Sequence, residues 1–67
     1  MTVEITKQQI VLNDRISFVY NNEPRTITVT NIGANKQGEQ FITGKTDNNE
    51  YKSFSIGRIY GRIARLV

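Results

Sequence analysis

Hydrophobic and polar residues alternate along most of the chain, and this alternation is typical of strands that bury one face. Ile16, Phe18 and Tyr20 alternate with Ser17 and Val19. In residues 25–32 the threonines Thr26, Thr28 and Thr30 alternate with Ile27, Val29 and Asn31. Residues 40–45 and 51–56 are further short segments that mix apolar and polar residues in the manner of strands. The alternation therefore predicts strands over these segments, with polar turn residues between them.

The two ends of the chain are less regular. Thr6-Lys7-Gln8-Gln9 fits the capping box that opens a helix, although Val3 and Ile5 alternate as in a strand. A short helix over residues 7–13 is the favoured interpretation. Residues 58–67 fit a helix by the spacing of their apolar positions, but Gly61 and the β-branched residues favour a fifth strand.

The turn signals recur about every ten residues, which is typical of a small closed β-structure. Asn21-Asn22-Glu23-Pro24, residues 33–38 and residues 47–50 supply them. Closure into a barrel removes exposed sheet edges. The chain is therefore predicted to be a single mainly β domain over residues 1–67, a five-stranded SH3-like or Sm-like barrel with a short N-terminal helix.

Charge is distributed unevenly along the chain. Residues 1–50 hold five Lys or Arg and six Asp or Glu, a balance of 5 − 6 = −1. Residues 51–67 hold Lys52, Arg58, Arg62 and Arg65 with no acidic residue, a balance of +4. A basic segment favours an anionic partner such as nucleic acid, and it equally fits a solvated positive face.

The residue types of most active sites are missing. The chain has no histidine and no cysteine, which removes the usual nucleophile and base pairs and the usual zinc ligands. The six carboxylates lie mostly in predicted turns and show no close pairing in sequence. We therefore expect no enzyme activity, no metal and no cofactor. No apolar run is long enough to span a bilayer and no signal peptide is evident, so a cytoplasmic protein without membrane contact is expected.

The segment Lys52-Ser53-Phe54-Ser55-Ile56-Gly57-Arg58-Ile59 resembles a signature of WYL domains, Arg-x-Phe-x-hydrophobic-x-Arg-Ile/Met. Residues 15–20, with their terminal tyrosine, resemble the first strand of that family, and residues 25–29 resemble its arginine-bearing second strand. Gln40-Phe41-Ile42 stands where the family has Trp-Tyr-Leu. The chain thus resembles a divergent WYL domain, and we expect it to be free-standing, without the helix-turn-helix that usually accompanies the family.

The resemblance implies an Sm-like barrel with a ligand face for nucleic acid or another anion. By motif match this face holds Tyr20, Arg25, Lys52, Phe54 and Arg58. Phe54 and Ile59 are nevertheless expected in the core, because a small barrel needs its large apolar side chains inside. Arg62 joins the candidate binding residues, and Arg62 and Arg65 face opposite sides if this segment is a strand.

Two functions follow from these patterns. The leading hypothesis is a non-enzymatic regulatory module that binds single-stranded nucleic acid or a nucleotide-like anion through Tyr20, Arg25, Lys52, Arg58 and Arg62. The alternative is a protein-interaction module, a small regulator or inhibitor that docks on another protein or assembles as a homo-oligomer. It would use an exposed strand edge or residues 63–67.

Overall fold

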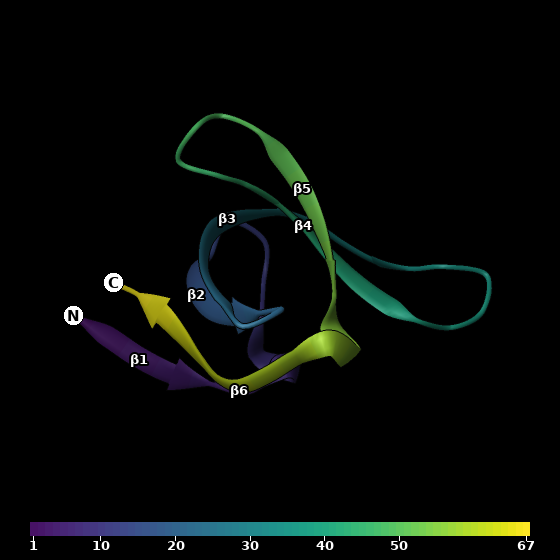
Figure 1. Ribbon diagram of the computed structural model, residues 1–67, viewed down its shortest axis with the longest axis horizontal. Coiled ribbons are helices and arrows are strands. Elements are labelled where there is room, and N and C mark those ends of the chain that lie inside the picture. Colours follow the sequence, from purple (N-terminus) through teal and green to yellow (C-terminus); the bar gives the residue numbers. More distant parts are fainter.

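The computed structural model describes residues 1–67 and is mainly β, with six antiparallel strands in one sheet (Figure 1). The strands are β1 (Thr2–Ile5), β2 (Arg15–Tyr20), β3 (Glu23–Ala34), β4 (Gln40–Lys45), β5 (Tyr51–Ser55) and β6 (Ile59–Leu66). Two single turns of 3-10 helix, η1 (Lys7–Gln9) and η2 (Ile56–Arg58), interrupt them. The order across the sheet is β1-β6-β2-β3-β4-β5.

The sheet curls around the core but does not close, so the prediction of a five-stranded barrel is wrong in strand number and in closure. After β5 the chain passes through η2, and β6 then pairs with β1 and β2 rather than with β5. Strands β1 and β5 are consequently left as edges, each paired on one side only.

The N-terminal segment forms a strand and one helical turn instead of the predicted helix over residues 7–13. The amide of Thr6 donates to Gln9 Oε1 at 2.8 Å, as in the capping box, but the helix ends at Gln9. In a longer helix the Gln9 carbonyl would accept from the Asn13 amide. Here it accepts from Arg65 at 2.9 Å, and the Asn13 amide donates to the Val29 carbonyl at 2.8 Å. Tertiary hydrogen bonds thus replace the helical one.

Asparagines shape the turns between the strands. Asn21 and Asn22 both have positive φ, 52° and 63°, and they form the two-residue loop of the β2–β3 hairpin. Two such residues are typical of a type I′ turn, whose twist matches that of the strands. Strand β3 consequently starts at Glu23, and it extends two residues beyond the predicted Ile32.

The last segment is a strand, as predicted, and it lies between two partners. β6 pairs with β1 on one side and with β2 on the other, and a register shift opposite residues 17–19 accompanies Gly61 at φ +82°. The chain termini therefore lie side by side, with the Val67 amide donating to the Met1 carbonyl at 3.0 Å (Figure 1). Neither helical turn is long and apolar enough to cross a membrane.

The core is built almost entirely from β-branched side chains on the inner face of the sheet. Eight of its eleven buried residues are isoleucine, a residue that suits pleated strands. The buried set is Ile5, Ile10, Ile16, Phe18, Ile27, Val29, Ile42, Phe54, Ile56, Ile59 and Ile63. Gly44 lies beneath Ile27, where an added Cβ would stand 2.7 Å from the Ile27 Cβ. The absence of a side chain on β4 thus lets Ile27 pack against its backbone.

Candidate functional site

An aromatic cluster joins β2 to the edge strand β5 at one end of the core. Phe54 packs edge-to-face against Tyr20, with ring centroids 5.0 Å apart, and against Phe18, with centroids 5.3 Å apart. Phe54 is buried, as predicted, whereas Tyr20 is only half-buried. Part of the Tyr20 ring is thus available at the surface while its remainder is held by Phe54.

Arg25 approaches this cluster from β3. It is the register partner of Phe18, so its side chain starts from the inner face of the sheet. Its Nη2 lies 2.8 Å from Glu23 Oε2, and about a third of the side chain, 35%, is exposed. The Nε atom is buried without a hydrogen-bond partner. Arg25 therefore has one acidic neighbour and one buried donor without a partner.

Lys52 and Arg58 complete the group. Lys52 precedes Phe54 by two residues on β5 and so lies on the same face of that strand. Arg58 ends η2 next to Ile59, the register partner of Tyr20. Both cations are exposed, and neither forms an ion pair.

These residues form what we call the Tyr20 cluster, defined as Tyr20, Glu23, Arg25, Lys52, Phe54 and Arg58. It holds three cations and one anion, a local charge of 3 − 1 = +2. Three elements besides β3 contribute these residues: β2 holds Tyr20, β5 holds Lys52 and Phe54, and η2 ends at Arg58. The Tyr20–Phe54 contact joins β2 to β5. A polar rim on an aromatic base is suited to holding a flat anionic group by charge and by stacking.

Arg62, the fifth predicted binding residue, lies apart from this cluster. It projects from the outer face of β6, its side chain is 86% exposed, and its Nε is 3.6 Å from Glu4 Oε1 on β1. An exposed pair at this distance contributes little to stability. Of the five predicted residues, Tyr20 contacts the aromatic core, and Arg25, Lys52 and Arg58 come from the elements next to it, whereas Arg62 lies on the outer face of β6.

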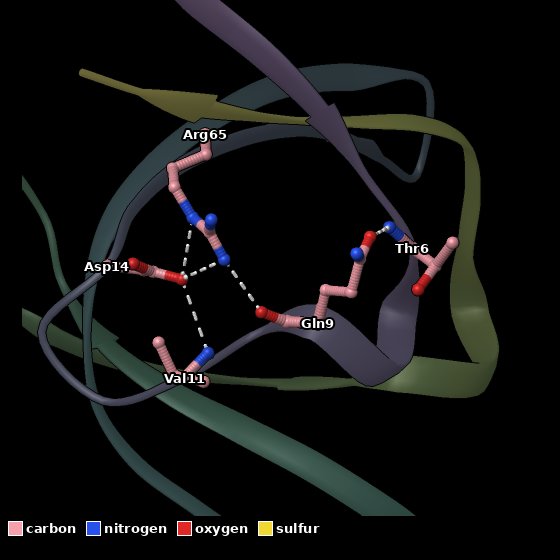
Figure 2. Close-up of polar contacts among 5 residues, drawn as sticks. All are labelled: Thr6, Gln9, Val11, Asp14 and Arg65. Carbon is pink, nitrogen blue, oxygen red and sulfur yellow. Dashed lines mark hydrogen bonds and ion pairs between the residues drawn. The ribbon is translucent and has the colours of Figure 1, made fainter.

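Arg65 lies opposite Ile16, at the end of β2 that is far from Tyr20, and its side chain is held by several polar contacts (Figure 2). Its guanidinium binds Asp14 Oδ2 at 3.1 Å and the Gln9 carbonyl at 2.9 Å, and Asp14 Oδ2 also accepts from the Val11 amide at 3.3 Å. These contacts fasten residues 6–14 to β6. Arg62 and Arg65 face opposite sides of β6, as expected for a strand, and only Arg62 is fully solvated.

The basic character of residues 51–67 is therefore partly neutralised in space. Glu4 and Asp14, both from the N-terminal part of the chain, lie against Arg62 and Arg65. Two of the four cations, Lys52 and Arg58, remain without an acidic partner, and both belong to the Tyr20 cluster. Sequence reasoning missed this pairing because it joins the two ends of the chain.

A separate cleft lies between η1 and the β3–β4 hairpin. It has a volume of about 480 Å³ and adjoins a second cleft of about 330 Å³. Both are lined by Lys7, Gln8, Gln40 and Ile56. None of the residues selected from the sequence lies in either cleft, and no three carboxylates gather anywhere in a way that suits a metal ion.

Comparison of the chain with protein-family models, with curated proteins and with solved structures finds no match.

Proposed function

We propose that the protein is a non-enzymatic regulatory module that binds single-stranded nucleic acid or a nucleotide-like anion at the Tyr20 cluster. The observation that carries this proposal is the contact of the half-buried Tyr20 with Phe54, with Arg25 opposite Phe18 on the next strand. Lys52, two residues before Phe54, and Arg58, next to the Tyr20 partner Ile59, are exposed and have no acidic partners. The resemblance of the same residues to the WYL signature supports it, and membership of that family is part of the proposal.

Each side chain has a distinct part in such binding. Arg58 offers a planar fork that can hold a phosphate through two hydrogen bonds, whereas Lys52 acts as a point charge. The exposed part of the Tyr20 ring offers a surface for a base, supported from behind by Phe54. Counterion release then makes the affinity fall as salt rises.

The test is a fluorescence-anisotropy titration with labelled single-stranded DNA and RNA of about 15 nucleotides. It is run at about 50 and 200 mM salt, on the wild type and on Arg58→Ala. We expect binding that weakens with salt, and a loss of about fivefold or more in the variant, with a shallower salt dependence. Lys36→Ala is the matched control, because Lys36 is an exposed, unpaired cation in the β3–β4 loop. No binding at the lower salt, or equal affinity of wild type and Arg58→Ala, rejects the proposal.

A second candidate function, protein interaction, is favoured by the free edge of β5. The Thr46 amide donates to the Glu50 carbonyl at 2.8 Å, and alternation from this pair directs the backbone groups of Lys52 and Phe54 toward β4. The groups of Tyr51, Ser53 and Ser55 therefore point away from the sheet. An extended segment of another protein, or a second copy, can pair there. Residues 63–66, in contrast, lie between β1 and β2 and offer no free edge.

Ser53→Pro tests this second function, because it removes an outward amide without removing a hydrogen bond to β4. Analytical ultracentrifugation of the purified protein and of the variant reports self-association. A stoichiometric protein partner that survives nuclease treatment and is lost in Ser53→Pro supports the interaction module. A monomer that binds nucleic acid and has no protein partner contradicts it.

A further inference from the structure

The outer face of the sheet carries an exposed aromatic residue that the sequence patterns did not single out. Tyr60 lies on β6 between the buried Ile59 and the glycine bulge, and 74% of it is exposed. Its register partner on β2 is Val19, which is 47% exposed, and the partner of Val19 on β3 is Pro24. Three adjacent strands thus present Tyr60, Val19 and Pro24 as one apolar row facing water.

Arginines flank this row along the chain. Arg58 precedes Tyr60 by two residues, is exposed and has no acidic partner. Arg62 follows Tyr60 by two residues and contacts Glu4, which lies on the outer face because the neighbouring Ile5 is buried. Each arginine is two positions from Tyr60, so its Cα lies within about 7 Å of the Tyr60 Cα in any backbone conformation. Both long side chains can therefore reach phosphates on either side of a group stacked on Tyr60.

We propose that Tyr60, flanked by Arg58 and Arg62, is a second contact surface for single-stranded nucleic acid, with the Tyr60 ring stacking on a base and the arginines binding adjacent phosphates. This inference rests on the proposed function and names a surface that the Tyr20 cluster does not include. An exposed tyrosine provides the sequence-tolerant stacking that proteins use on single strands, and arginine adds charge.

The charges around the apolar row favour nucleic acid over a protein as the occupant. The acidic residues near the apolar row are Glu4 and Glu23, and each already lies against an arginine, at 3.6 Å and 2.8 Å respectively. The unpaired charge that remains is that of Arg58. A polyanion with flat bases complements both the positive charge and the exposed ring.

Arg58 also connects the two surfaces. Ile59, next to it, pairs with Tyr20 on the inner side, and Tyr60 follows on the outer side. Ile59 and Tyr60 are successive residues of β6 and point to opposite faces, and Arg58 ends the turn η2 directly before them. A strand of nucleic acid that passes the start of β6 can therefore meet Tyr20 and Tyr60 in turn, with Arg58 beside both.

The experiment compares Tyr60→Ala with Tyr60→Phe and with the control Tyr51→Ala, which removes another exposed tyrosine from the edge strand β5. The probes are a labelled oligothymidine of about 15 nucleotides and an abasic sugar-phosphate oligomer of the same length. We expect Tyr60→Ala to weaken oligothymidine binding by roughly tenfold and to leave abasic binding unchanged. Tyr60→Phe and Tyr51→Ala should bind both probes like the wild type.

Failure of this inference is distinguishable from failure of the proposed function. If the wild type binds neither probe, both fall. If the wild type binds and depends on Arg58, but Tyr60→Ala binds oligothymidine unchanged, only the Tyr60 surface is rejected. Equal weakening of both probes by Tyr60→Ala also rejects stacking, and circular dichroism of the variant verifies that its strands are intact.

Discussion

An arginine starts from the inner face of the curled sheet at each end of the core, and the two arginines have different surroundings. Arg65 binds Asp14 and the Gln9 carbonyl, groups that lie 51 and 56 residues away along the chain. Arg25 binds Glu23, which lies two residues away on the same strand. The contacts of Arg65 hold the segment of residues 6–14 against β6, whereas the contact of Arg25 links two neighbouring positions of β3 and joins no distant segment.

The difference shows that an arginine whose side chain starts on the core side of the sheet does not necessarily hold parts of the fold together. Arg65 uses its donors on a half-buried carboxylate, with side-chain exposures of 31% and 15% for the pair. Arg25 leaves Nε without a partner and pairs with a glutamate that is 65% exposed. The Arg65 end is thus satisfied internally, whereas the donors of the Tyr20 cluster that remain open to an external acceptor are those of the exposed Lys52 and Arg58.

The largest expected effect comes from breaking the aromatic contact that supports the Tyr20 cluster. Phe54→Ala removes a buried ring and should lower the free energy of unfolding by about 3–5 kcal/mol. A chain of 67 residues has a total stability of only about 3–10 kcal/mol, so extensive unfolding is expected. Urea denaturation followed by circular dichroism measures it. Phe41→Ala, a half-buried phenylalanine on the neighbouring strand, should cost about 1 kcal/mol, and equal losses would contradict the role of Phe54.

An intermediate effect is expected at the Arg65 end. Arg65→Met keeps the apolar stem but leaves the Asp14 carboxylate, which is largely buried, without its cation, and should cost about 2 kcal/mol of stability. Arg62→Met, an exposed arginine on the same strand, should change stability by less than about 0.5 kcal/mol. Urea unfolding of the two variants measures their free energies of unfolding. A similar loss of stability in both variants would mean that Asp14 is not held by Arg65.

The smallest effect is expected from Glu23. Glu23→Gln removes the acidic partner of Arg25 and should raise the affinity for single-stranded nucleic acid about two- to fivefold, because exposed ion pairs are worth less than about 1 kcal/mol. Asp47→Asn, which removes the partner of Arg15 in a similarly exposed pair, is the control and should leave affinity unchanged. The same anisotropy titration measures the affinity of both variants. Unchanged or weaker binding by Glu23→Gln would show that Arg25 is not part of the binding surface.

Local patterns predicted much of the fold. The alternation around Ile16, Phe18 and Tyr20 corresponds to β2, and Asn21-Asn22 forms the turn that follows. The choice of strand over helix for residues 58–67 is confirmed by β6. These features depend on residues that are neighbours in sequence, so the local sequence pattern is enough to predict them.

What the sequence did not predict depends on long-range partners. The helix expected over residues 7–13 is absent because Arg65 and Val29 take the hydrogen bonds that would extend it. Strand β1 is stabilised by pairing with β6, which lies at the other end of the chain. The sheet stays open because the turn η2 leads the chain away from β5, so that β6 does not pair with β5. The grouping of the residues that the motif match selected stays a prediction. Tyr60 belongs to no motif, and its exposure emerges only from the register of β6.

The pairing of β1 with β6 also has a consequence for the order in which the chain folds. This ladder joins the two ends of the chain, and the Met1 amine reaches the Val67 carbonyl across 66 positions. Contacts so distant in sequence carry the highest loop-closure entropy, whereas the β2–β3, β3–β4 and β4–β5 hairpins close locally. We therefore expect the hairpin meander to form in the transition state and β1 to dock afterwards, as the segment whose detachment begins unfolding.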